Sequence, residues 1–120
     1  MYDFNKKKIL ITGGTDGIGA ATASLLVILG ADVYIIGRSA EKGEALVEKA
    51  REKAATGQLK FLQADFSLMR TVLQSAEKLA ELTSHIDLLV HCVGILISRA
   101  EHTAEGVEKD FAVGYLSRFA

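Results

Sequence analysis

Hydrophobic residues gather in four short runs that recur at regular intervals along the chain. Each run has the length and the content of aliphatic residues that are typical of a strand buried inside a protein. The segments between the runs are too long for a hairpin, and they fit a crossover helix that joins two parallel strands. The predicted strands are Ile9–Thr12, Val33–Ile36, Leu59–Ala64 and Ile86–Cys92.

The first two intervening segments carry clear helix signals. Residues 20–29 are apolar almost all round and are followed by Gly30, a residue typical of the position just after a helix, so we expect a heavily buried helix. The next helix is expected to begin at Ser39 as its N-cap and to stop at Gly57, with one apolar stripe along a polar surface.

Two more helices are predicted from the later segments. The periodicity after Ser67 fits a helix, and so does the pattern that begins near Thr103. Strands and helices therefore alternate through residues 1–120, which predicts a single α/β domain. We expect a doubly wound parallel sheet of strand order 3-2-1-4, covered by helices on both faces. A nucleotide would lie across the carboxyl ends of its strands.

Composition narrows the classes of function. With 49% hydrophobic and 24% charged residues, the sequence is that of a globular domain, and a formal net charge of −1 offers no broad attraction to nucleic acid or anionic lipid. The longest apolar stretch, Leu25–Leu29, is far shorter than a membrane span, and the N-terminus shows no secretory leader. A single cysteine, Cys92, and the absence of metal-binding spacings predict no disulfide, no metal and a cytoplasmic location.

The first predicted strand runs into a glycine-rich turn directly before the first helix. Gly13 and Gly14 permit a tight turn, Gly17 lets the backbone approach a pyrophosphate, and Gly19 lets helix and strand pack closely. Such a turn can be purely structural, but its place in the first βα unit is the one that a dinucleotide-binding fingerprint requires. The candidate phosphate-binding residues are Thr12, Gly13, Gly14, Thr15, Asp16, Gly17, Ile18 and Gly19.

The spacing Thr-Gly-x-x-x-Gly-x-Gly in this turn resembles that of the short-chain dehydrogenase/reductase family. Further matches are Ala64-Asp65-Phe66 after the third strand, residues 91–94 at the place of the family's Asn-Asn-Ala-Gly motif, and residues 103–116 at its fourth-helix signature. The resemblance covers the whole chain but only about half of the family's domain. It implies a Rossmann-type fold, truncated after about four strands, from an enzyme that transfers hydride between a nicotinamide cofactor and a carbonyl or alcohol substrate.

The resemblance also assigns roles to particular residues. Asp65 and Phe66 would meet the adenine, and the backbone at Gly94 would border the nicotinamide ribose. The family's catalytic Ser and Tyr-x-x-x-Lys have no counterpart in this chain, so we expect no catalytic residue here and a substrate bound by the missing C-terminal half. Gly114 stands where the family usually has an Asn that supports a proton relay. The fourth helix is one by which relatives often dimerise, so a homo-oligomer is expected.

Arg38 follows the second strand, where an acidic side chain binds the ribose 2′-hydroxyl in NAD enzymes and an arginine accommodates the 2′-phosphate of NADP. Together with Ser39 it favours NADP(H) over NAD(H) as the cofactor. An alternative remains, in which Arg38 is a solvated residue that opens the second helix. Asp16 also speaks against NADP(H), because many NADP-preferring relatives carry a basic residue there.

The sequence also suggests structural roles for His91 and Cys92 and leaves two alternative functions open. We interpret His91 as a packed, hydrogen-bonded histidine and Cys92 as an inert core thiol rather than as reactive groups. Instead of a reductase half, the chain could be a non-catalytic NADP(H)-binding or interaction module. It could also be a truncated product without a role of its own.

Overall fold

The computed structural model describes residues 1–54, 56–95 and 97–120. Its strands form one parallel sheet in the order β3-β2-β1-β4, which confirms the predicted α/β fold and strand order. In register, Ile9 of β1 lies between Val33 of β2 and Leu88 of β4. The elements are β1 (Lys8–Thr12), α1 (Gly17–Ile28), β2 (Asp32–Gly37), α2 (Ala40–Lys53), β3 (Gln58–Gln63), α3 (Met69–Leu82), β4 (Leu88–His91), α4 (Lys109–Gly114) and the 3₁₀ turn η1 (Leu116–Arg118).

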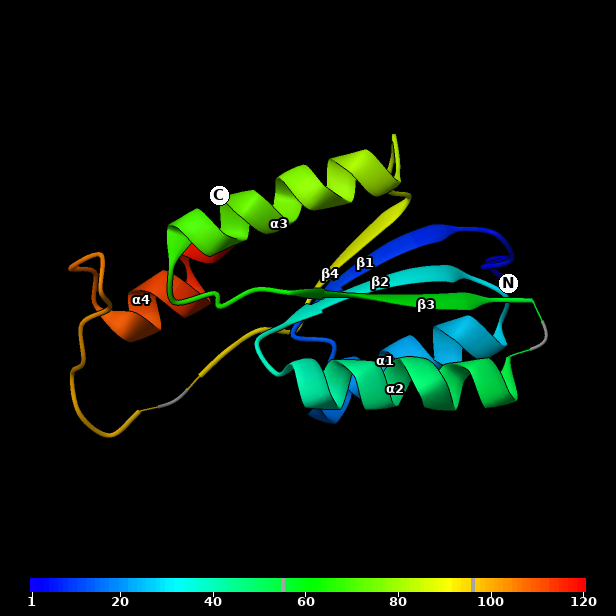
Figure 1. The fold of residues 1–120 in the computed structure, drawn as a ribbon, viewed down its shortest axis with the longest axis horizontal. Helices are drawn as coiled ribbons and strands as arrows, with labels where there is room; N and C mark the ends of the chain where they lie inside the picture. Colours follow the sequence, from blue (N-terminus) through cyan, green and yellow to red (C-terminus); the bar gives the residue numbers. More distant parts are fainter. Residues whose placement is uncertain (55, 96) are drawn as a thin grey trace.

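Helices cover both faces of the sheet (Figure 1). Helices α1 and α2 lie on one face, and α3 lies on the other with α4 beside its N-terminal end. Alternate residues of each strand point to opposite faces, so Ile9 and Ile11 enter the core under α1 while Leu10 packs against the cluster under α3. Each face thus has its own apolar core, as expected for a sheet covered on both sides.

The prediction that the first helix is heavily buried is only partly correct. Ala23 and Val27 are buried against the sheet, but Leu25 and Ile28 on the opposite side are more than half exposed. A helix that rests on one sheet buries one stripe, and within the described residues no second layer covers the outer side of α1. Gly30 does follow the helix end with φ +89°, as its sequence position predicts.

The fourth helix begins later than expected. Residues 103–107 form a turn in which the Thr103 N–H donates to the Val107 carbonyl at 2.7 Å, and Gly106 has φ +77°. The helix starts only at Lys109, after Glu108 caps it by accepting hydrogen bonds from two backbone N–H groups. The prediction of a helix from Thr103 is therefore wrong, because a turn closed by Gly106 interrupts the pattern.

The other boundaries shift by a few residues. The second helix stops at Lys53 rather than Gly57, and regular pairing in β4 covers only the centre of the predicted strand. Backbone hydrogen bonds from Asp87 to Lys8 and from Cys92 to Thr12 nevertheless extend the β1–β4 contact by one residue at each end. Strand β4 is an edge of the sheet, as predicted.

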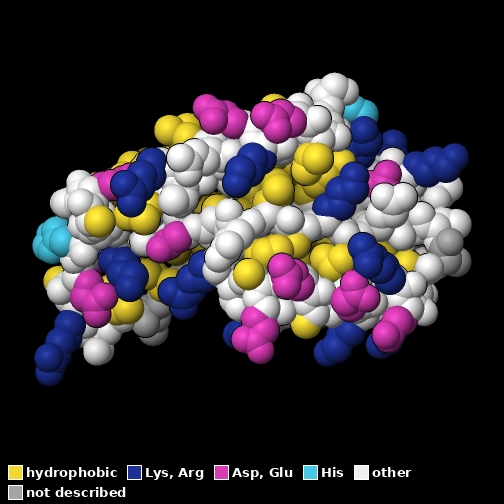
Figure 2. Space-filling model, in the orientation of Figure 1, with side chains coloured by type: hydrophobic (Ala, Val, Ile, Leu, Met, Phe, Trp, Pro, Cys, Tyr) yellow, Lys and Arg dark blue, Asp and Glu magenta, His cyan; other side chains and the backbone are white. Residues whose placement is uncertain are grey.

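The surface mixes charges of both signs. Figure 2 shows lysine and arginine side chains interspersed with aspartate and glutamate over the visible face, without a field of one sign. Within the described residues, no helix is long and apolar enough to cross a membrane.

Candidate functional site

A cleft of about 560 Å³ lies at the carboxyl ends of all four strands. Each wall is the segment that follows one strand, so residues far apart in sequence meet at this edge of the sheet. The volume lies within the range of cofactor pockets in proteins. The lining residues come from within segments 13–19, 37–42, 64–67 and 92–95, joined by Lys109 and Val113 from α4.

The glycine-rich turn forms the floor of the cleft. Gly13 has φ +72°, and a Cβ atom there would stand 2.8 Å from the backbone nitrogen of Val93. Gly17 has φ +52° and nothing within 4 Å of its Cβ position, so this side of the turn is open. A side chain at Gly13 would collide with the backbone that follows β4, whereas Gly17 leaves room for a ligand next to the backbone.

Asp16 joins the glycine-rich turn to helix α2. One of its carboxylate oxygens accepts the Gly17 N–H at 2.8 Å and caps α1, and the other accepts from the Lys42 ammonium at 2.5 Å. The pKa of Asp16 lies below its ordinary value, first because of the hydrogen bond from Lys42 and then because of the one from Gly17. In the free protein, the carboxylate that argued against NADP(H) is therefore paired with a lysine.

Arg38 and Ser39 form the wall between β2 and α2. Arg38 is exposed, and its guanidinium makes no ion pair with any acidic side chain in the described part of the chain. Its backbone is held in place, because the Gln63 side chain donates to the Arg38 carbonyl at 3.1 Å. Ser39 caps α2 as predicted, accepting from the Lys42 N–H at 3.3 Å. A solvated guanidinium on a fixed backbone is a suitable partner for an anionic ligand group.

Asp65 and Phe66 follow β3 and line the next part of the cleft. The Asp65 carboxylate accepts the Ser67 N–H at 2.9 Å, which fixes its orientation. Phe66 is only 6% exposed and packs in the core under α3, so it borders the cleft from the buried side.

Thr12 of β1 and His91 of β4 connect neighbouring strands just before the segments that line the cleft. The Thr12 hydroxyl lies 3.1 Å from His91 Nδ1. The expectation of a hydrogen-bonded His91 is correct, but its ring is exposed rather than packed. Partial desolvation, and then the nearby charge of Arg118, lower the pKa of His91. Cys92 is half-buried and packs against the core under α1.

The structure brings most of the predicted binding residues together at this cleft. Thr12 and Gly14 do not reach the wall: Thr12 is buried beneath it, and a Cβ on Gly14 would meet the Ile35 side chain at 2.5 Å. Sequence reasoning missed Lys42 and Lys109. Lys42 had a signal, because the third residue after an N-cap such as Ser39 points back toward the cap. The residues that do line the cleft are Gly13, Thr15, Asp16, Gly17, Ile18, Gly19, Arg38, Ser39, Asp65, Phe66 and Gly94.

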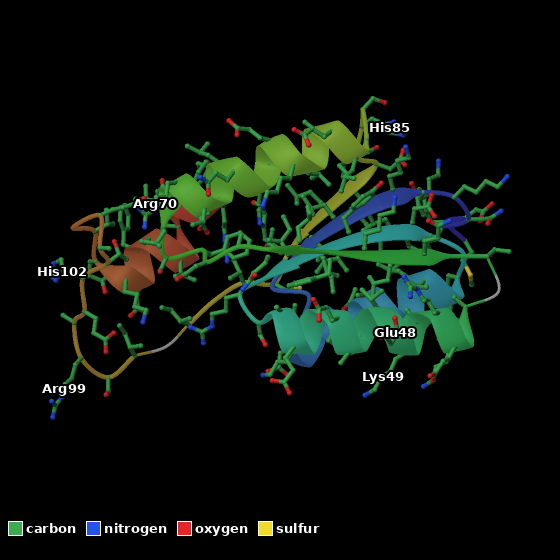
Figure 3. The ribbon with its side chains drawn as sticks, in the orientation of Figure 1. Glu48, Lys49, Arg70, His85, Arg99 and His102 are labelled. Carbon is green, nitrogen blue, oxygen red and sulfur yellow. The ribbon has the colours of Figure 1, made fainter. Side chains whose placement is uncertain are left out.

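None of the three histidines is among the described residues that line the cleft. His85 and His102 are exposed in loops at opposite ends of the molecule (Figure 3). Among residues 1–54, 56–95 and 97–120, no group of three or more His, Cys, Asp or Glu side chains is arranged to hold a metal ion.

Comparison with known proteins identifies the family. The model of the family described as short chain dehydrogenase matches residues 7–119. The chain belongs to this family. It is 32% identical over 110 residues to the human polyprenol dehydrogenase, covering 92% of this chain and 33% of that protein. It is 34% identical to the WW domain-containing oxidoreductase of Drosophila melanogaster, covering 98% of this chain and 29% of the relative.

Solved structures agree with the fold of this short-chain dehydrogenase chain. An NADH-dependent reductase in complex with NAD matches with a TM-score of 0.78 and 28% identity, over 98% of this chain and 49% of the other. The NADP active-site complex of Pseudomonas aeruginosa RhlG matches with a TM-score of 0.81 and 28% identity, over 99% of this chain and 47% of the other. The chain thus spans about a third of the length of these curated relatives and about half of these structures.

Proposed function

We propose that this chain is the NADP(H)-binding portion of a short-chain dehydrogenase/reductase that transfers hydride between NADP(H) and a carbonyl or alcohol substrate. The cleft supports this proposal by its shape and its chemistry. It runs along the carboxyl ends of the strands, its floor is free of side chains at Gly17, and its walls carry cationic groups at Arg38 and Lys42. An extended dinucleotide with negative phosphates fits such a site.

The proposed binding residues follow the length of the cofactor. The glycine-rich turn and the N-terminus of α1 hold the pyrophosphate, where backbone N–H groups and the helix dipole favour negative charge. Asp65 and Phe66 border the adenine, and Gly94 borders the nicotinamide ribose. Arg38 and Ser39 hold the 2′-phosphate. The cofactor supplies the hydride, and the residues of this chain orient its nicotinamide at the end of β4.

Arg38 is the observation that carries the preference for NADP(H). The solved relatives include one complex with NAD and one with NADP, so family membership does not decide between the two cofactors. An acidic residue after β2 would hydrogen-bond a 2′-hydroxyl and repel a 2′-phosphate, whereas a guanidinium binds the phosphate with two charge-assisted hydrogen bonds. Position 38 carries a guanidinium, and within the described part of the chain this group forms no ion pair that would compete with the phosphate.

Calorimetric titration of the chain with NADPH and NADH tests this preference. We expect NADPH to bind about tenfold to a hundredfold more tightly, and Arg38→Ala to remove most of that difference. Arg51→Ala is the matched control. Arg51 is an arginine in the last turn of α2 that pairs with Glu48 and does not line the cleft. Equal affinities of the wild-type chain for the two cofactors would refute the NADP(H) assignment.

Gly114 favours a second candidate function, a non-catalytic NADP(H)-binding or interaction module. It ends α4 where the family usually has the Asn of its proton relay, and nothing lies within 4 Å of its Cβ position. NADPH oxidation over a panel of aldehydes and ketones separates the two functions. We expect no carbonyl-dependent turnover by the 120-residue chain, because the family's catalytic Ser and Tyr-x-x-x-Lys, which supply its proton donor, have no counterpart in residues 1–120.

A chain extended with the second half of a relative tests the role of position 114. We expect this extended chain to recover part of the activity, and Gly114→Asn to raise it further. An extended chain that binds NADPH but shows no carbonyl-dependent NADPH oxidation would favour the non-catalytic binding module. Turnover by the unextended chain, surviving removal of host reductases, would overturn the half-enzyme hypothesis.

A further inference from the structure

An ion pair spans the adenosine end of the cleft. The Lys42 ammonium from the first turn of α2 lies 2.5 Å from Asp16 of the glycine-rich turn. Both residues line the cleft together with Arg38 and Ser39. Two cationic side chains from the same wall therefore flank the place where a phosphate on the adenosine ribose would lie, and one of them is held by a carboxylate of the opposite wall.

The two walls are fixed relative to each other independently of this pair. A Cβ atom on Gly37 would stand 2.6 Å from the Thr15 side chain, so the glycine-rich turn rests directly on the end of β2. Ser39 caps α2 and Asp16 caps α1. The backbone at both ends of the ion pair is thus held by other contacts, and Lys42 can change its partner by side-chain rotation alone.

The pair is weak enough to exchange. The side chains of Lys42 and Asp16 are 56% and 74% exposed, and ion pairs in contact with water contribute little. A phosphate monoester carries up to two negative charges near neutral pH and offers three acceptor oxygens, whereas the carboxylate carries one charge. A 2′-phosphate is therefore the stronger partner for a lysine that can reach both.

We propose that Lys42 determines cofactor specificity together with Arg38, moving from Asp16 to the 2′-phosphate when NADP(H) binds. Asp16 holds the ammonium at the cleft in the free protein and competes with the phosphate for it. This inference rests on the proposed function, since it concerns the same cleft and the same ligand group. NADH has no 2′-phosphate, so its binding leaves the Asp16–Lys42 pair in place.

The test measures NADPH and NADH affinities for a small set of variants. We expect Lys42→Ala to weaken NADPH binding about tenfold and to change NADH binding less than about twofold. Lys42→Arg should retain the preference for NADPH. Asp16→Asn should strengthen NADPH binding several-fold, because the amide still caps α1 while the competing charge is gone. Raising the salt concentration should reduce the NADPH preference of the wild type more than that of Lys42→Ala.

Lys49→Ala is the matched control, because Lys49 is an exposed lysine of α2 that points away from the sheet and does not line the cleft (Figure 3). Thermal unfolding of each variant shows whether the fold is retained. If Arg38→Ala removes the NADPH preference while Lys42→Ala and Asp16→Asn leave it unchanged, this inference is wrong and the proposed function stands. If the wild type binds both cofactors equally and no variant alters the ratio, both are wrong.

Discussion

Gly19 lies against Gly13, so closely that a Cβ atom on Gly19 would stand 2.2 Å from the Gly13 carbonyl oxygen. Helix α1 can therefore pack this closely on the end of β1 only if residue 19 has no side chain beyond a hydrogen atom. We expect Gly19→Ala to destabilise the fold by about 1–3 kcal/mol, because a backbone carbonyl cannot move aside as a side chain can. Chemical unfolding at neutral pH measures this loss.

Gly114→Ala is the matched control for that substitution. Its Cβ would meet nothing within 4 Å, and the residue ends a helix. Replacing a helical glycine by alanine usually stabilises by about 0.5–1 kcal/mol. A Gly19→Ala variant as stable as Gly114→Ala would show that the close contact at the turn is absent in solution.

His91 should make the stability depend on pH. Its folded pKa lies below the unfolded value of about 6.5, so the unfolded chain takes up a proton first as the pH falls. The contribution of neutral His91 is thus complete above about pH 6.5 and is lost as the pH drops toward its folded pKa.

We expect His91→Asn to flatten this dependence, because an amide does not titrate, while it can still hydrogen-bond Thr12. Urea unfolding at several pH values between about 5 and 8 measures the effect. His102→Asn is the control, since His102 lies in an exposed loop far from β4. The prediction is wrong if the unfolding free energy of His91→Asn depends on pH as in the wild type while that of His102→Asn does not.

Glu105 should anchor the segment before α4 to helix α3. Its two carboxylate oxygens accept the N–H groups of Met69 at 2.8 Å and Arg70 at 3.1 Å, at a helix start that has no capping side chain of its own. Arg70 accordingly lies at the end of α3 beside this segment (Figure 3). These hydrogen bonds hold the pKa of Glu105 below its usual value of 4.5.

We expect Glu105→Gln to lower the melting temperature at neutral pH and Glu105→Ala to lower it further. The difference from wild type should be complete above about pH 4.5 and should shrink as the pH falls through the folded pKa of Glu105. Glu77→Gln on α3 is the control, and thermal unfolding between about pH 3 and 7 is the measurement. If the difference in melting temperature stays constant over this pH range, the ionised Glu105 carboxylate does not stabilise the start of α3.

The edge strand β4 should promote self-association of the chain. Leu88 and Leu89 are 39% and 49% exposed, and in the described structure β4 pairs on one side only. Unpaired backbone groups beside exposed leucines favour the addition of another strand. We expect Leu89→Lys to shift the chain toward monomers in sedimentation velocity. Leu73→Lys, on an equally exposed leucine of α3, should change association much less.

Local patterns in the sequence predicted the frame of the molecule. Runs such as Val33–Ile36 signal strands by themselves, and intervals that fit only a crossover helix make those strands parallel. Ser39 and Gly30 marked the start of α2 and the end of α1 because capping depends on the conformation of one or two residues. The glycine spacing likewise placed the turn at the centre of the cleft.

The tertiary structure alone decided the features that depend on distant partners. The start of α4 was missed because Glu105 caps α3 and a turn precedes the helix. Leu25 is exposed because it lies on the side of α1 that faces away from the sheet. The sequence placed Asp16 beside the expected phosphate site but did not show its partner in an ion pair. Its charge is balanced by Lys42, which lies on another element, and a one-dimensional pattern records the spacing of residues but not which charges meet across a cleft.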